Sequence, residues 1–114
     1  MISDSIKMPD TNNINVRLFG NGHSMSCCDA DYIGLLGMQV NASQRVILMH
    51  PKGTQLEVEL TLNMKNGSKR CKLPAIVTNR SNNRMGLTFI NNTLQANAIL
   101  MEIILALRAH DAVQ

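Results

Sequence analysis

Two aspartates, Asp29 and Asp31, stand two residues apart in the segment CCDADYIG and are followed by Gly34. This spacing is typical of a calcium-binding loop, in which the three residues would take the first, third and sixth positions. Such a loop also needs oxygen ligands at its fifth and twelfth positions, where this chain has Ile33 and Val40. The segment therefore does not predict a calcium site.

Soft-metal binding and catalysis are two further kinds of chemistry to consider here. The nearby histidines and cysteines lack the CxxC or HxxxH spacing of a zinc site; they are His23, Cys27, Cys28 and His50. Paired carboxylates can act as general acid and base, but the serines beside them stand in no recognisable nucleophile motif. We therefore expect no metal site, no enzyme activity and no required cofactor.

The composition is that of one globular domain. The 114 residues, 45% of them apolar and 17% charged, suffice for a single hydrophobic core. One tyrosine, two phenylalanines and a net charge of +3 do not favour a nucleic-acid partner. Three cysteines, two of them adjacent, make a poor disulfide framework and favour a cytoplasmic location. The longest apolar run, 98–107, contains Glu102 and is too short to span a bilayer.

Short strands are the elements that would position the two aspartates. Apolar and polar residues alternate over 14–19 and over 56–65, which is typical of strands with one buried face. An Asn-Gly pair then signals a hairpin, and the segments 71–77 and 85–90 continue the pattern. Five or six such strands joined by tight turns predict a small antiparallel barrel.

The two ends of the chain differ from this pattern. Residues 1–13 are polar and are expected to form a flexible N-terminal arm, which leaves 14–114 as a single domain. The segment 93–110 predicts a helix, which Asn92 or Thr93 can cap.

Two apolar stripes run along the expected C-terminal helix. The first consists of Leu94, Ala98, Met101 and Leu105, and the second of Leu100, Ile103, Ile104 and Leu107. Together they are wider than packing on one barrel requires. The helix therefore either lies deep in a groove or also contacts a partner chain, and we assign the partner contact to the second stripe.

The order of these segments resembles the PilZ domain family, one of whose motifs is Asp/Asn-x-Ser-x-x-Gly followed by a strand. DADYIG matches it at Asp29 and Gly34 and has Asp31 in place of Ser. The segments KGTQLEVELTL and KLPAIVTNRSNNRMGLTFI resemble the family's long strand and its next hairpin, so the resemblance covers about 14–107. It implies a six-stranded antiparallel barrel with one C-terminal helix, and in many members a site for the bacterial second messenger cyclic di-GMP.

The resemblance breaks at the positions that would bind phosphate. The family's second motif, Arg-x-x-x-Arg, lies before the first strand, and its arginines clamp phosphate and stack on guanine. Residues 1–13 contain no arginine; their one cation is Lys7, with Thr11 four positions on. Asp31 puts a carboxylate where a phosphate should approach, and like charges repel. Each missing charge-assisted hydrogen bond costs about 1.5–3 kcal/mol, enough in sum to abolish micromolar binding.

Three hypotheses about function follow. The chain is a non-enzymatic regulatory module of bacterial cyclic di-GMP signalling that contacts a partner protein, or a second copy of itself, through the second stripe. Alternatively, it is a cyclic di-GMP receptor whose site is rebuilt from Asp29, Asp31, Gly34, Lys7, Arg17, Arg80 and Arg84. A third hypothesis is a small basic barrel that binds RNA through Lys65, Lys69, Arg70 and Lys72.

Overall fold

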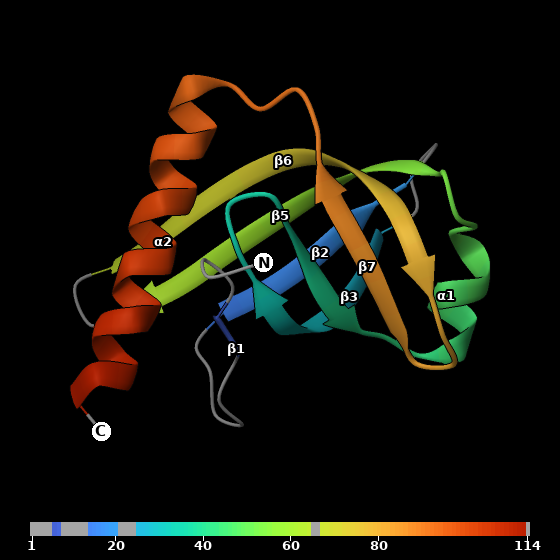
Figure 1. Cartoon of the computed structure of the whole chain (residues 1–114), viewed down its shortest axis with the longest axis horizontal. Helices are drawn as coiled ribbons and strands as arrows, with labels where there is room; N and C mark the ends of the chain where they lie inside the picture. Colours follow the sequence, from blue (N-terminus) through green and yellow to red (C-terminus); the bar gives the residue numbers. More distant parts are fainter. Residues whose placement is uncertain (1–5, 8–13, 21–24, 65–66, 114) are drawn as a thin grey trace.

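An antiparallel barrel lies between two helices at opposite ends of the molecule's long axis (Figure 1). The computed structural model describes residues 6–7, 14–20, 25–64 and 67–113. The strands are β1 (Ile6–Lys7), β2 (Ile14–Phe19), β3 (Met25–Ile33), β4 (Gly37–Asn41), β5 (Gln55–Met64), β6 (Gly67–Arg80) and β7 (Arg84–Phe89). The helices are α1 (Gln44–Met49) and α2 (Leu94–Val113). No described helix is long and apolar enough to cross a bilayer.

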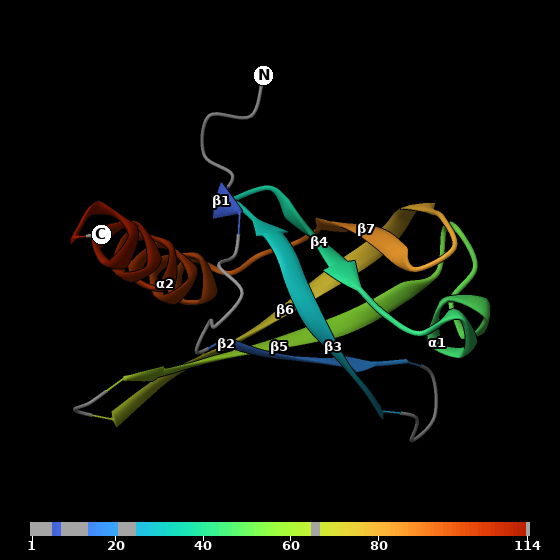
Figure 2. The same ribbon diagram turned by 90° about the horizontal axis from the view of Figure 1, so that it is seen from below.

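Six of these strands close into a ring. Their order is β3-β2-β5-β6-β7-β4, and a further pairing of β3 with β4 completes the barrel. Figure 2 shows β3 running from the edge of β2 up to β4, where the ring closes. All pairings are antiparallel, so the predicted six-stranded barrel is confirmed.

The strand β3 changes partner part-way along its length. Its first half pairs with β2 as far as Cys28, which lies opposite Val16. From Asp29 onward it pairs with β4, and its register shifts between Ala30 and Tyr32. The motif aspartates therefore lie where β3 leaves β2: Asp29 pairs with Asn41 of β4, and Asp31 lies on a bulge that bends the strand.

The core is formed by the inward-facing residues of the alternating strands. In β2 and β5 the buried side chains follow the predicted period of two: Ile14, Val16, Leu18, Leu56, Val58, Leu60 and Leu62. Burial of one such aliphatic side chain contributes about 1.5–3 kcal/mol relative to leaving it in water. Alternation thus places every second residue of these strands on the outer surface, where the candidate site lies.

The helix α2 packs one face on the barrel and leaves another in solvent. Thr93 accepts a hydrogen bond at Oγ1 from the Ala96 amide, 3.0 Å away, and so caps the helix start. The second stripe is the buried one, with exposed fractions of 0–7%: Leu100, Ile103, Ile104 and Leu107. Our assignment of these four residues to a partner contact is therefore wrong, because they belong to the chain's own core. The first stripe is the exposed one.

Two elements do not follow from the sequence pattern. The apolar run RVILM lies within α1, which Ser43 caps by accepting a hydrogen bond at Oγ from the Val46 amide. In the expected flexible arm, Ile6–Lys7 forms β1 and pairs with Tyr32–Ile33 of β3, so this part of the arm is ordered. The remainder of 1–13 lies outside the described residues.

Candidate functional site

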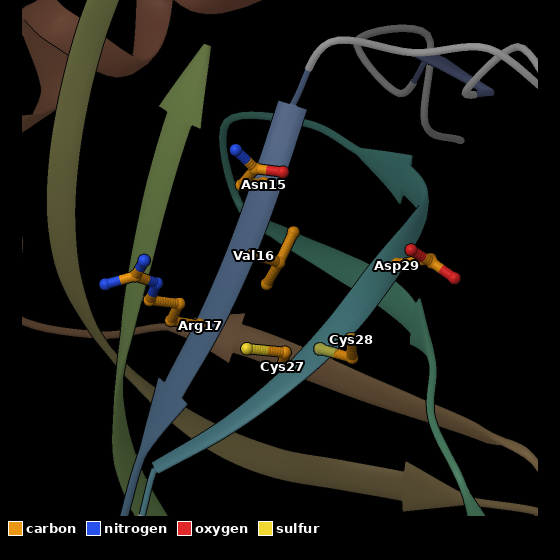
Figure 3. Close-up of a pocket in the computed structure, with 6 residues that line it drawn as sticks. All are labelled: Asn15, Val16, Arg17, Cys27, Cys28 and Asp29. Atoms are coloured by element: carbon orange, nitrogen blue, oxygen red, sulfur yellow. The ribbon is translucent and has the colours of Figure 1, made fainter. Parts of the chain in front are cut away.

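A hollow of about 390 Å³ opens on the barrel where β3 parts from β2 (Figure 3). It is lined by Asn15, Val16 and Arg17 of β2 and by Cys27, Cys28 and Asp29 of β3. The hollow forms here because the pairing of β2 with β3 ends at Val16 and Cys28. It brings together two of the candidate residues, Arg17 and Asp29, but not the other cations.

The side chains of Arg17 and Asp29 point to opposite sides of the hollow (Figure 3). Arg17 turns toward β5, where its Nη1 lies 3.8 Å from Oε1 of Glu59. The Glu59 side chain is only 7% exposed, and its second oxygen lies 4.0 Å from Nε of Arg70. A buried carboxylate is costly unless it is paired. Glu59 therefore holds both arginines over β5.

Asp31 has partners of its own on two other strands. Its Oδ2 lies 3.7 Å from Nε of Arg84 on β7 and accepts a hydrogen bond from Nε2 of Gln39 on β4, at 3.3 Å. The Asp31 side chain is only 14% exposed, and Asp29 is exposed beside Asn41. The structure thus neutralises the carboxylate that replaces the motif serine, and in doing so engages one of the candidate arginines.

Arg80 serves another element. Its Nη1 donates a hydrogen bond to the backbone oxygen of Ile47, 2.8 Å away, at the end of α1. A positive charge is favourable there because helix C-termini carry partial negative charge. The candidate arginines Arg17, Arg80 and Arg84 therefore each contact an acceptor within the protein. The side chain of the remaining cation, Lys7, lies outside the described residues.

Gly34 occupies the turn between β3 and β4. Its amide donates to the backbone oxygen of Gly37 at 2.9 Å. Among the described glycines, positive φ angles occur at Gly53 and Gly67, so backbone freedom does not explain the glycine at position 34.

The cations proposed for RNA binding also have partners within the chain. Lys69 forms an ion pair with Glu102 of α2, and Arg70 lies beside Glu59. The Lys72 ammonium stands 5.7 Å from the centre of the Phe19 ring. Lys65 lies outside the described residues. The described part of this patch is thus largely committed to contacts within the fold.

The three cysteines and His50 do not gather into a metal site, and His23 lies outside the described residues. No group of three His, Cys, Asp or Glu side chains among the described residues could hold an ion. Burial raises the pKa of Cys28 to about 12, with further contributions from Asp29 and Cys27. His50 is buried at the end of α1, with Nε2 lacking a hydrogen-bond partner, and burial lowers its pKa. Both side chains are therefore held neutral at pH 7.

Solved structures provide the comparison with known proteins. No family model and no curated protein matches the sequence. The PilZ domain of YcgR from Escherichia coli, solved with c-di-GMP, superposes with a TM-score of 0.72 at 17% identity, over 94% of this chain and 90% of that one. The chain has the PilZ fold.

Two further structures agree with this assignment of fold. The PilZ domain of CeSA from a cellulose-synthesizing bacterium has a TM-score of 0.65 at 18% identity, covering 93% of this chain and 99% of that one. An uncharacterised Legionella protein has a TM-score of 0.61 at 16% identity, covering 95% and 97%. The fold implied by the resemblance of DADYIG to the PilZ motif is confirmed.

Proposed function

We propose that this chain is a non-enzymatic PilZ-fold module of bacterial cyclic di-GMP signalling that acts through protein contacts and does not itself bind the messenger. The observation that carries the proposal is the contact of Arg84 with Asp31, at 3.7 Å. Asp31 stands at the motif serine position, and its carboxylate engages the guanidinium of Arg84. The proposed setting is the bacterial cytoplasm, with no cofactor.

A phosphate bound near β3 would have to displace ion pairs that already exist within the protein. A phosphate near β3 would face the Asp31 carboxylate, and Arg84 would have to leave that carboxylate to meet the phosphate. Arg17 would likewise have to leave buried Glu59, which would then keep only Arg70 as a partner, and weakening a buried ion pair is costly. With charge-assisted hydrogen bonds worth about 1.5–3 kcal/mol each, these exchanges bring little net gain.

Calorimetric titration with cyclic di-GMP at physiological salt tests the proposal. We expect no saturable heat from the wild-type chain. The matched variant Lys7→Arg/Thr11→Arg/Asp31→Ser restores both motif patterns of the family. We expect it to bind cyclic di-GMP with a micromolar dissociation constant, which corresponds to a binding free energy of about 6–8 kcal/mol. Adding Asp29→Ala to this variant should abolish the gain. Micromolar binding by the wild-type chain would overturn the proposal.

A receptor with a rebuilt site is the second candidate, because Arg17 and Asp29 line the same hollow. If this function holds, wild-type binding is lost on Arg17→Ala or Asp29→Ala. It should be kept in Arg45→Ala, which removes an exposed arginine from α1, away from the hollow. The same titration therefore separates the two functions.

A further inference from the structure

The first stripe of α2 forms a line of apolar side chains on the solvent side of the helix. Its members are Leu94, Ala98, Met101 and Leu105, all exposed, and its three large side chains are 44–90% exposed. At 100° per residue these four positions fall within about 60° of the helix circumference. The stripe therefore presents one continuous strip that the barrel does not cover.

This strip has the same spacing when it is read in either direction. A leucine stands at each end, and the gaps between successive members are four, three and four residues. A two-fold axis that lies between the two helices, perpendicular to them and level with the point between Ile99 and Leu100, would place Leu94 against the partner's Leu105. The same axis would place the small Ala98 against the large Met101 of the partner subunit. Two-fold interfaces are self-complementary in this way.

We propose that two copies of this chain associate antiparallel through the first stripe of α2. This deepens the proposed function, because it names a second copy of the chain as a protein partner. Assembly can be measured without any dinucleotide. Failure of this inference therefore leaves the proposed lack of messenger binding untouched, and the converse also holds.

The charges beside the strip are compatible with this arrangement. Glu102 flanks the strip and is paired with Lys69 of its own copy. With a rise of about 1.5 Å per residue, Glu102 would lie about 3 Å along the axis from the partner's Gln95 and about 7.5 Å from the partner's Glu102. In the dimer, the Glu102 carboxylate would therefore lie nearer to the side-chain amide of the partner's Gln95 than to the partner's Glu102.

The strip is short, which sets the strength of association. Residues 94–105 span about 18 Å of helix, so the interface is smaller than the roughly 800 Å² per partner of a standard complex. We therefore expect a dimer with a dissociation constant in the micromolar range or weaker. Such a dimer is observed only when the chain is studied across a range of concentrations.

Sedimentation equilibrium from about 5 μM to 1 mM tests the dimer, since it spans the weak range expected. The wild-type mass should rise from 12.6 kDa toward twice that value. Leu94→Lys and Leu105→Glu should each remain monomeric while keeping the wild-type circular dichroism spectrum. The control Leu48→Glu, at an exposed apolar position of α1, should dimerise as the wild type does.

Mixing the two variants tests the antiparallel register. In a mixed dimer the introduced lysine faces the introduced glutamate, and the second contact remains Leu94 against the partner's Leu105. An equimolar mixture of Leu94→Lys and Leu105→Glu should therefore regain the dimer mass that neither variant has alone. A wild-type chain that stays at 12.6 kDa at 1 mM, or a mixture that stays monomeric, would overturn the proposal.

Discussion

Arg84 on β7 reaches across β4 to Asp31 on the bulge of β3, with Nε 3.7 Å from Oδ2. The two strands that it connects are the neighbours of β4 in the ring, and neither pairs with the other. The substitution of Ser by Asp at this motif position therefore has two effects. In the proposed function it opposes an approaching phosphate, and in the structure it adds an ion pair across the closing strands of the barrel.

A double-mutant cycle on this pair measures the second effect. Asp31→Asn and Arg84→Ala should each lower the free energy of unfolding by about 1 kcal/mol, because the pair is partly exposed. The double variant should lose little more than either single variant, since the two changes remove the same interaction. Urea unfolding monitored by circular dichroism is the measurement, with Arg45→Ala as a control for an exposed arginine. Strictly additive losses would mean that the ion pair contributes nothing.

Truncation of a side chain should lower the free energy of unfolding much more on the buried face of α2 than on its exposed face. Ile104 is 3% exposed and Leu105 is 55% exposed, although they are neighbours in sequence. Ile104→Ala should cost about 2–5 kcal/mol because it leaves a cavity in the core. Leu105→Ala should cost less than about 0.5 kcal/mol at low protein concentration, as surface substitutions do. Chemical unfolding at a concentration below dimer formation checks both, and equal losses would contradict the packing of α2 described above.

His50 should make stability depend on pH. Burial lowers its pKa below the ordinary value of 6.5, so the unfolded chain takes up a proton at a pH where the folded chain does not. Stability linked to His50 is therefore present above pH 6.5 and is lost as pH falls toward the lowered pKa. Urea unfolding at pH 7.5 and pH 5.0 should show a larger loss for the wild type than for His50→Gln. An equal loss in both proteins would exclude His50 as the cause.

The three cysteines should differ in reactivity. Cys27 is exposed, whereas Cys28 and Cys71 are protected by their surroundings and have raised pKa values, about 12 for Cys28. Since the thiolate is the reactive form, one thiol should react rapidly with a disulfide reagent at pH 8 and two slowly. The rapid phase should disappear in Cys27→Ser and remain in Cys71→Ser. Three rapid thiols in the folded chain would contradict the protection of half-buried Cys28 and buried Cys71.

Periodicity in the sequence predicted the barrel, because each strand of an antiparallel barrel has one buried face and one solvent-exposed face. Residues 56–65 show this alternation most clearly, and Leu56, Val58, Leu60 and Leu62 are all buried. Periodicity did not reveal α1, since a helix of one to two turns is too short to show a period. Periodicity also revealed two apolar stripes on α2. Our assignment of the second stripe to an exposed partner contact was wrong, because sequence alone does not orient a helix on its barrel.

The site was predictable only in part. The motif predicted Asp29 and Asp31 at a junction followed by a strand, whereas the structure has both within β3. The partners of the arginines were not predictable, because Glu59, Asp31 and the Ile47 carbonyl are reached through pairing between segments distant in sequence. In β5, Glu59 has the pattern of a solvent-facing residue, yet it is buried under the arginines of its neighbouring strands.

The closure of the ring by β4 also sets an order for folding. The strands β5 and β6 form one long hairpin, in which Met64 pairs with nearby Gly67, so this hairpin requires little loop closure. In contrast, β4 joins β7 through pairs as distant in sequence as Gly37 and Thr88. Contacts of such separation form late and slow the folding of β-rich domains. The hairpin should therefore act as the nucleus, and the region around Asp31 should become structured only in the last step of folding.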